Sequence, residues 1–118
     1  MTKTILVVDD DSDIQKVVKS VLKKEGYAIV TASTADECLK KSKEGKIDLI
    51  LLDIMMPGTS VRSIVPKIKN TKIAYLTIVQ TSDAEREYLL KQKNVVGFIQ
   101  KPFELKQLIA SVNKILAK

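Results

Sequence analysis

The chain has 118 residues, of which 45% are hydrophobic, and this length fits one compact domain over residues 1–118. One cysteine and no histidine exclude a disulfide within the chain and zinc sites of the usual Cys/His kind. The net charge is +6, but the 20 basic residues are scattered and only 4% of residues are aromatic, so direct nucleic-acid binding is not expected. No apolar run reaches the roughly 20 residues of a membrane-spanning helix. The N-terminus also lacks a signal-peptide pattern, so we expect a cytoplasmic protein without a membrane contact.

The first predicted elements are a strand, a helix and a second strand. Residues 4–8 form an apolar, β-branched run that predicts a buried strand, and the acids Asp9, Asp10 and Asp11 follow it. Ser12 with Gln15 fits a capping box at the start of a helix that ends near residues 25–26. The residues expected to face inward on this helix are Ile14, Val17, Val18, Val21 and Leu22. Residues 27–32 predict the second strand.

The next helix and strand lead to the most informative stretch of the chain. Thr34 with Glu37 forms another capping box, and the helix that follows carries Ala35, Cys38 and Leu39 inward before it ends near Gly45. Residues 48–53 predict the third strand. Its unbroken apolar run over residues 49–52 is typical of a strand buried on both faces of a parallel sheet. The strand ends in Asp53.

The second half of the chain continues the alternation. Apolar residues between positions 61 and 68 have helical spacing, but Pro66 would break a long helix, so we expect a short one. Residues 73–79 predict a fourth strand, Ser82 with Glu85 begins a helix reaching about residue 92, and residues 95–100 predict a fifth strand. The last helix is expected to face inward through Leu105, Leu108, Ile109, Val112, Ile115 and Leu116.

This pattern predicts an α/β fold with a doubly wound, five-stranded parallel sheet and five helices on its two faces. The carboxyl ends of parallel strands share one edge, where ligands bind in open α/β folds. The side chains that arrive there are Asp9, Asp10, Asp53, Lys101 and either Thr77 or Thr81. Crowded carboxylates favour Mg²⁺, and a lysine with a hydroxyl suits a phosphoryl group. Together they indicate phosphoryl transfer onto an aspartate.

Three segments in this order resemble one known family. The acid pair Asp9 and Asp10, the segment at residues 53–58 (DIMMPG) and the segment at residues 101–103 (KPF) stand as in receiver domains of two-component response regulators. The resemblance covers the chain from Thr4 to the last helix. It implies a flavodoxin-like (βα)5 fold with strand order 2-1-3-4-5. It also implies either a stand-alone receiver similar to chemotaxis regulators or a piece of a longer protein.

The resemblance also implies roles for individual residues. Asp53 would be the phosphoacceptor, Asp10 a direct ligand of Mg²⁺ (or Mn²⁺), and Asp9 a ligand acting largely through water. Met55 would give the ion a backbone carbonyl. Lys101 would contact the phosphoryl group and precede a cis bond to Pro102.

The family's signalling behaviour gives a second set of expectations. The phosphoryl donor would be a histidine kinase or a histidine phosphotransfer protein, which agrees with the absence of histidine here. Thr77, or less favourably Thr81, would move toward the phosphoryl group, and Phe98 would turn with it. The surface of the fourth helix, fifth strand and fifth helix would then change its protein partners, in a monomer or a phosphorylation-linked homodimer. Such a domain signals, and catalyses only its own phosphorylation and dephosphorylation.

Some residues depart from the family pattern. Ile78 stands where a small residue is usual, so we predict slow labelling by small phosphodonors, slower than for Ile78→Ala. Met55 and Val79 are apolar where the family varies polar groups that orient the attacking water. We therefore predict a long-lived aspartyl phosphate, and a half-life of seconds would contradict this. Asp53 and Lys101 are 48 positions apart, a few fewer than usual.

The acidic residues also allow three other interpretations. A receiver-like module that works through contacts without phosphorylation is the main alternative, and it has no need of Asp53 together with Lys101. A haloacid-dehalogenase-type phosphatase is suggested by Asp9 and Asp11, but 118 residues leave little room for a substrate cap. An EF-hand fails because Ile14 replaces the required glycine and Ser20 the final glutamate.

Overall fold

The computed structural model describes residues 2–54, 56, 58, 61–69, 71–78, 91–101 and 103–117, with only the backbone described at positions 77 and 78. Five strands form one parallel sheet in the order β2-β1-β3-β4-β5. Their bounds are β1 Thr4–Val8, β2 Ala28–Ala32, β3 Leu49–Asp53, β4 Lys72–Ile78 and β5 Val95–Lys101. The predicted α/β fold and strand order are confirmed.

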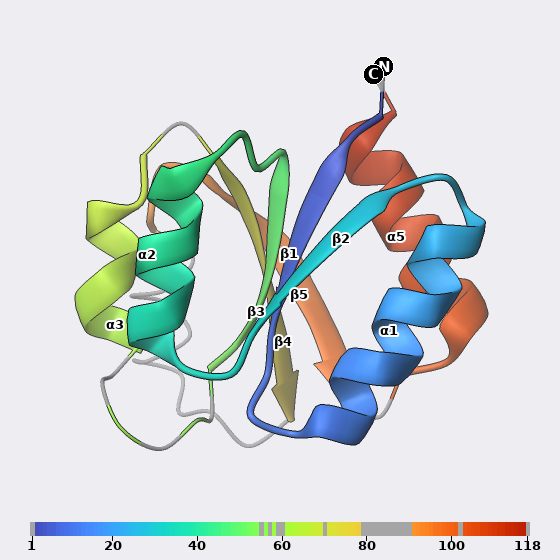
Figure 1. The fold of residues 1–118 in the computed structure, drawn as a ribbon, viewed down its shortest axis with the longest axis horizontal. Helices are drawn as coiled ribbons and strands as arrows, with labels where there is room; N and C mark the ends of the chain where they lie inside the picture. The colour runs from blue at the N-terminus through green and yellow to red at the C-terminus, as the bar shows by residue number, and fades with distance from the viewer. Residues whose placement is uncertain are drawn as a thin grey trace.

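Helices cover both faces of the sheet. Helices α1 (Ser12–Lys24) and α5 (Leu105–Leu116) pack on one face, and α2 (Ala35–Glu44) and α3 (Val61–Ile64) pack on the other (Figure 1). Helix α3 continues into a 3₁₀ turn, η1 (Val65–Lys67), which contains Pro66, so the predicted short helix is confirmed. The fourth predicted helix begins at Ser82, and residues 82–90 lie outside the described part of the chain.

The hydrophobic core has two layers because neighbouring strand residues point to opposite faces of the sheet. In β1, Leu6 and Val8 face the α2 and α3 side, whereas Ile5 and Val7 face the α1 and α5 side. The four residues from Leu49 to Leu52 are all fully buried, as predicted for a strand covered on both faces. Cys38 is buried in the layer between the sheet and helices α2 and α3, which confirms it as a core residue.

The ends of α1 follow from local chemistry, with one correction to the prediction. The N-cap is Asp11 rather than Ser12, and its carboxylate accepts hydrogen bonds from the backbone N–H groups of Asp13 and Ile14. The predicted capping box of Ser12 with Gln15 is therefore wrong. At the other end, Gly26 adopts a φ of 95° beyond the C-cap and closes the helix with a backbone bond to the Lys23 carbonyl.

The second predicted cap is confirmed in its main part. Thr34 is the N-cap of α2, and its hydroxyl accepts from the Glu37 N–H at 3.0 Å. Glu37 reaches the Ser33 N–H at 2.8 Å, one residue before the position that a capping box requires.

Two residues expected to face inward are exposed instead. Val17 in α1 is 46% exposed and Leu105 in the first turn of α5 is 41% exposed. Only a narrow stripe of each helix is fully buried, through Val18 and Leu22 in α1 and through Leu108 and Val112 in α5. No helix among the described residues is long and apolar enough to cross a membrane.

Strand β5 has one extra residue where it pairs with β4, because residues 95–101 pair with residues 73–78. Ile73 pairs with Val95, but the next residue, Ala74, pairs with Gly97, so Val96 is the extra residue of a bulge and is 44% exposed. Because of this bulge, Val95 and Phe98 lie on the same face of the sheet although three positions separate them. The bulge therefore sets which way the end of β5 presents its side chains.

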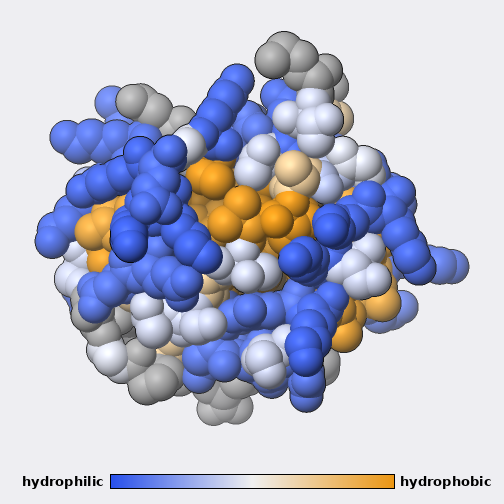
Figure 2. Space-filling model, in the orientation of Figure 1, coloured by the Kyte–Doolittle hydropathy of each residue, from blue (hydrophilic) through white to orange (hydrophobic). Residues whose placement is uncertain are grey.

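The surface of the edge strand is partly apolar. Figure 2 shows an apolar band between the hydrophilic side chains of α1 and α2, where β2 crosses the front of the molecule. Ile29 and Val30 of β2 are each partly buried, against opposite core layers. The carboxyl ends of the strands carry buried polar residues, Asp9 after β1 and Asp53 in β3.

Candidate functional site

Two buried strands deliver acids to the carboxyl edge of the sheet. Asp9 directly follows β1 and is 1% exposed, and Asp53 is the last residue of β3 and is 4% exposed. Asp10, the next residue after Asp9, is exposed. Burial of a carboxylate is costly unless it is paired, so the surroundings of Asp9 and Asp53 must supply partners.

Lys101 is the cationic partner of these acids. It is the last residue of β5, and its Nζ donates to Asp9 Oδ2 at 2.6 Å. The same Nζ lies 3.6 Å from Asp53 Oδ2, which is an ion-pair contact rather than a short hydrogen bond. The Lys101 side chain is only 13% exposed. One ammonium thus lies between two buried carboxylates.

The backbone completes the environment of Asp9. The Asp11 N–H donates to Asp9 Oδ1 at 3.0 Å, and the Asp9 N–H donates to the Ala32 carbonyl at 3.1 Å. Both oxygens of the Asp9 carboxylate therefore have donors, as a buried carboxylate requires.

The acids suit a divalent cation. Asp9, Asp10 and Asp53 each offer a carboxylate oxygen, and these oxygens lie within 4.8 Å of one another. Three carboxylates and one ammonium leave a formal charge of −2 on this group of four side chains, which a divalent ion would balance. Oxygen-only ligands with an exposed member that leaves room for water fit Mg²⁺ or Mn²⁺. The residues present therefore fit such an ion.

The remaining predicted site residues are described only in part. Met55, Thr81 and Pro102 lie outside the described residues, and Thr77 is described in its backbone alone, in β4 opposite Gln100. Phe98 is half-buried, and its ring meets the Tyr75 ring edge-on with centroids 5.2 Å apart. Phe98 is thus placed on the face of the sheet that carries α2 and α3.

Two contacts at this edge were not expected from the sequence. Lys101 was expected to contact a phosphoryl group, and its 2.6 Å bond to Asp9 was not foreseen. The Gln15 side chain was expected to bond the N-terminus of its own helix, but its two amide hydrogens are shared among three acceptors, Asp9 O, Ala32 O and Ser33 Oγ. The signal available in the sequence was Asp11, which is as good a cap as Ser12 and shifts the helix start by one residue.

Comparison with known proteins identifies the family. The model of the response regulator receiver domain family matches residues 5–113. The chain belongs to this family. The receiver domain is 32% identical, over 120 residues, to the alkaline phosphatase synthesis transcriptional regulatory protein PhoP of Bacillus subtilis, covering 100% of this chain and 50% of that protein. It is 34% identical over 119 residues to the regulatory protein VanR of Enterococcus faecium, covering 100% of this chain and 52% of that protein. The chain thus spans about half the length of these curated relatives.

Solved structures support the same assignment. A CheY-like response regulator receiver domain protein from Methanospirillum hungatei superposes with a TM-score of 0.91 at 28% identity, covering 99% of this chain and 95% of that one. The chemotaxis protein CheY4 of Vibrio cholerae superposes with a TM-score of 0.87 at 26% identity, covering 98% of this chain and 100% of that one. The receiver fold therefore extends over nearly the whole chain.

Proposed function

We propose that this receiver domain takes a phosphoryl group onto Asp53 from the phosphohistidine of a histidine kinase or a histidine phosphotransfer protein. The observation that carries the proposal is the group of Asp9, Asp10, Asp53 and Lys101 gathered at the carboxyl edge of the sheet. Residues 1–118 contain no histidine, so the phosphohistidine must lie outside this domain. Receiver domains in general signal rather than turn over an external substrate, and residues 1–118 would act as one such domain.

The transfer is a substitution at phosphorus. An Asp53 carboxylate oxygen forms the new bond to phosphorus, and the bond from phosphorus to the imidazole nitrogen breaks. The electron pair of the broken bond stays on the imidazole, which returns to its neutral form after proton exchange with solvent. The product is an aspartyl phosphate, with no change in oxidation state.

The other acids and Lys101 prepare Asp53 for this step. Asp9 and Asp10, together with Asp53 and the Met55 carbonyl, would hold Mg²⁺ or Mn²⁺, which neutralises charge on the phosphoryl oxygens when bound. Lys101 places a second positive charge 3.6 Å from Asp53 Oδ2, within reach of a group carried by that oxygen. Met55 lies outside the described residues, so its carbonyl remains a proposal.

The output would be a shift between two conformations of the domain. Thr77, or Thr81, would move toward the phosphoryl group, and Phe98 would change its packing against Tyr75. The surface formed by the fourth helix, β5 and α5 would then change its protein partners. The domain would act as a monomer or as a homodimer linked to phosphorylation.

The test is intact-mass measurement after incubation with acetyl phosphate and Mg²⁺, for the wild type and Asp53→Asn. The expected result is the gain of one phosphoryl group that requires both Mg²⁺ and Asp53. Beryllofluoride, followed by NMR, checks the site independently of small-donor reactivity. Absence of labelling together with absence of a beryllofluoride response would overturn the proposal in favour of a phosphorylation-independent interaction module.

The same measurement tests the two expectations about rate. Ile78→Ala should label faster with acetyl phosphate than the wild type, because the smaller side chain leaves more room beside Asp53. The aspartyl phosphate of the wild type should decay slowly, since Met55 and Val79 cannot orient the attacking water. The side chains of all three residues lie outside the described part of the structure, so both expectations stay predictions.

A further inference from the structure

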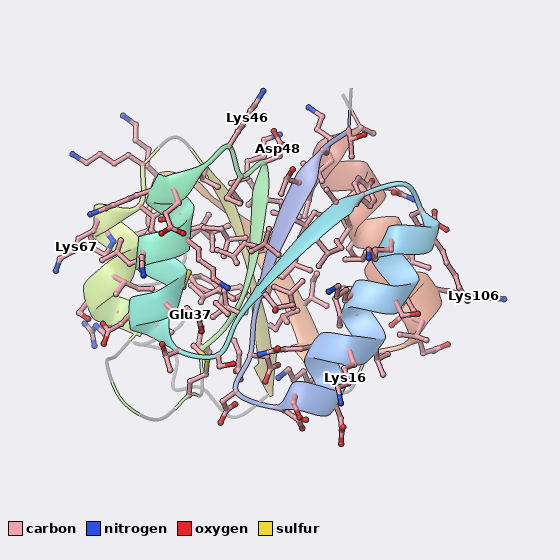
Figure 3. The ribbon with its side chains drawn as sticks, viewed as in Figure 1. Lys16, Glu37, Lys46, Asp48, Lys67 and Lys106 are labelled. Carbon is pink, nitrogen blue, oxygen red and sulfur yellow. The ribbon has the colours of Figure 1, made fainter. Side chains whose placement is uncertain are left out.

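The Gln15 side chain connects helix α1 to the loop that carries the acid pair. Its backbone continues the helix, with the Gln15 N–H bonded to the Asp11 carbonyl at 3.1 Å. Its amide Nε2 turns back and lies 2.5 Å from Asp9 O, 3.1 Å from Ala32 O and 3.1 Å from Ser33 Oγ. The neighbouring Lys16 extends into solvent from the same turn of α1 (Figure 3). Of these two neighbouring residues, Gln15 therefore turns toward the loop and Lys16 away from it.

The atom that Gln15 binds most closely belongs to the peptide between the two acids. The Asp9 carbonyl and the Asp10 N–H form one planar unit, so fixing this carbonyl fixes the plane that leads into Asp10. The Asp9 N–H is bonded to the Ala32 carbonyl, which also accepts from Gln15. The backbone of Asp9 is therefore fixed on both sides.

Asp10 depends on its backbone more than Asp9 does. Both carboxylate oxygens of Asp9 have donors, from the Asp11 N–H and from Lys101. The Asp10 side chain is exposed, and no hydrogen bond to its carboxylate is found within the described ranges of the chain. The backbone position from which Asp10 extends toward the other two acids thus depends on the peptide that Gln15 holds.

The far side of the Gln15 contact is itself ordered by a chain of polar contacts. The Ser33 N–H donates to Glu37 Oε1 at 2.8 Å, and the other Glu37 oxygen pairs with Lys41 at 3.1 Å. Lys41 also donates to the Thr31 carbonyl of β2. The pKa of Glu37 lies below its usual value, mainly because of the hydrogen bond from the Ser33 N–H and then because of Lys41. This carboxylate therefore stays ionised and keeps its partners. Glu37 lies near the start of α2, toward the end of the molecule where the strands finish (Figure 3).

We propose that Gln15 is a positioning residue for the cation site. By holding the Asp9–Asp10 peptide against the β2–α2 loop, it orients the Asp10 carboxylate toward Asp9 and Asp53 before the ion arrives. The inference rests on the proposed function, because it assigns Gln15 to the same site. Groups that orient a metal ligand without touching the ion commonly change metal affinity by about 10-fold to 100-fold when they are removed. Since Gln15 acts through the backbone, we expect the lower end of this range.

The experiment is a Mn²⁺ titration of the whole chain, followed by water-proton relaxation, which reports the bound ion directly and needs no phosphoryl transfer. Gln15→Met keeps the length and helix propensity of the side chain but removes its donors, and we expect about tenfold weaker Mn²⁺ binding. Gln107→Met makes the same change on the exposed surface of α5 and should bind Mn²⁺ with the affinity of the wild type. Ser33→Ala leaves both carbonyl acceptors of Gln15 in place, so its Mn²⁺ affinity should stay within about twofold of the wild-type value.

Urea unfolding of each variant separates positioning from a general loss of folding. If Gln15→Met is unfolded, the titration is done with Gln15→Asn instead. The Asn side chain keeps the neutral amide but is one methylene too short to reach the same oxygens. Wild-type affinity in a folded variant of either kind would overturn the inference while the proposed function stands. Absence of Mn²⁺ binding by the wild type, together with absence of Mg²⁺-dependent labelling of Asp53, would overturn the proposed function and the inference with it.

Discussion

Replacing Lys101 by methionine removes the ammonium that lies between Asp9 and Asp53. The two N···O distances are 2.6 and 3.6 Å, and the Lys101 side chain is 13% exposed. At an effective dielectric constant of about 20, unit charges at these distances of 2.6 and 3.6 Å attract by about 6 and about 5 kcal/mol. Desolvation of the three charges offsets much of this attraction. Removing one partner of a buried pair costs about 3–5 kcal/mol, and the solvent exposure of the site on the Asp10 side favours the lower value. We therefore expect Lys101→Met to lose about 3 kcal/mol of unfolding free energy without a divalent cation.

Urea unfolding with and without Mg²⁺ measures this loss. Lys106→Met makes the same change at an exposed position of α5 (Figure 3) and should alter stability by less than about 0.5 kcal/mol. Saturating Mg²⁺ should narrow the deficit of Lys101→Met, because carboxylates that have lost the ammonium bind the cation more tightly than those of the wild type. Equal urea midpoints for Lys101→Met and the wild type without Mg²⁺ would refute the reasoning, as would a deficit that Mg²⁺ leaves unchanged.

Three further predictions concern the cap, the cysteine and the bulge. Asp11→Ala should lose about 1 kcal/mol in urea unfolding and Ser12→Ala much less, since Asp11 caps α1; the reverse order would contradict the assigned cap. Burial raises the pKa of the Cys38 thiol from 9.0 to about 12. Native protein at pH 8 should therefore resist a disulfide reagent until urea is added. The free energy of unfolding contributed by the neutral thiol should be fully present below pH 9 and should decline toward pH 12. Deleting Val96 should leave Mg²⁺-dependent labelling intact because it removes the extra residue of the bulge, whereas deleting Gln100 should abolish labelling because Lys101 then turns to the other face.

The sequence predicted the strands and most of the site because both follow from burial. Unbroken apolar runs before Asp9 and Asp53 can be satisfied only in a sheet covered on both faces, and such runs must end at the sheet edge. Lys101 was found for the same reason, at the end of the fifth run. Which of these side chains pair with each other depends on the distances between strands, and a local sequence pattern carries no information on those distances.

The start of α1 and the shape of β5 show where local patterns are insufficient. Asp11 and Ser12 are nearly equal as N-caps, so only the folded loop decides between them. With Asp11 as the cap, Gln15 is the fourth helical residue and cannot make the bond of a capping box, which leaves its amide free to reach Asp9 and Ala32. In β5, Gly97 has no side chain to mark a face, so the alternation of residues 95–100 does not reveal that Val96 is extra.

The position of Lys101 suggests an order of events at the site. Its ammonium is 1.0 Å closer to Asp9 than to Asp53, by the difference between 3.6 and 2.6 Å, so Asp9 competes with Asp53 for the same charge. A divalent ion held by the acids would share the charge of Asp9 and weaken this competition. Lys101 would then need to move only a short way to contact a group on Asp53. Because Asp10 is the exposed acid while Asp9, Asp53 and Lys101 are largely buried, the ion and the donor would both approach from the Asp10 side. The exposed acid would therefore be the one at the entrance, where the role proposed for Gln15 would orient it before the ion binds.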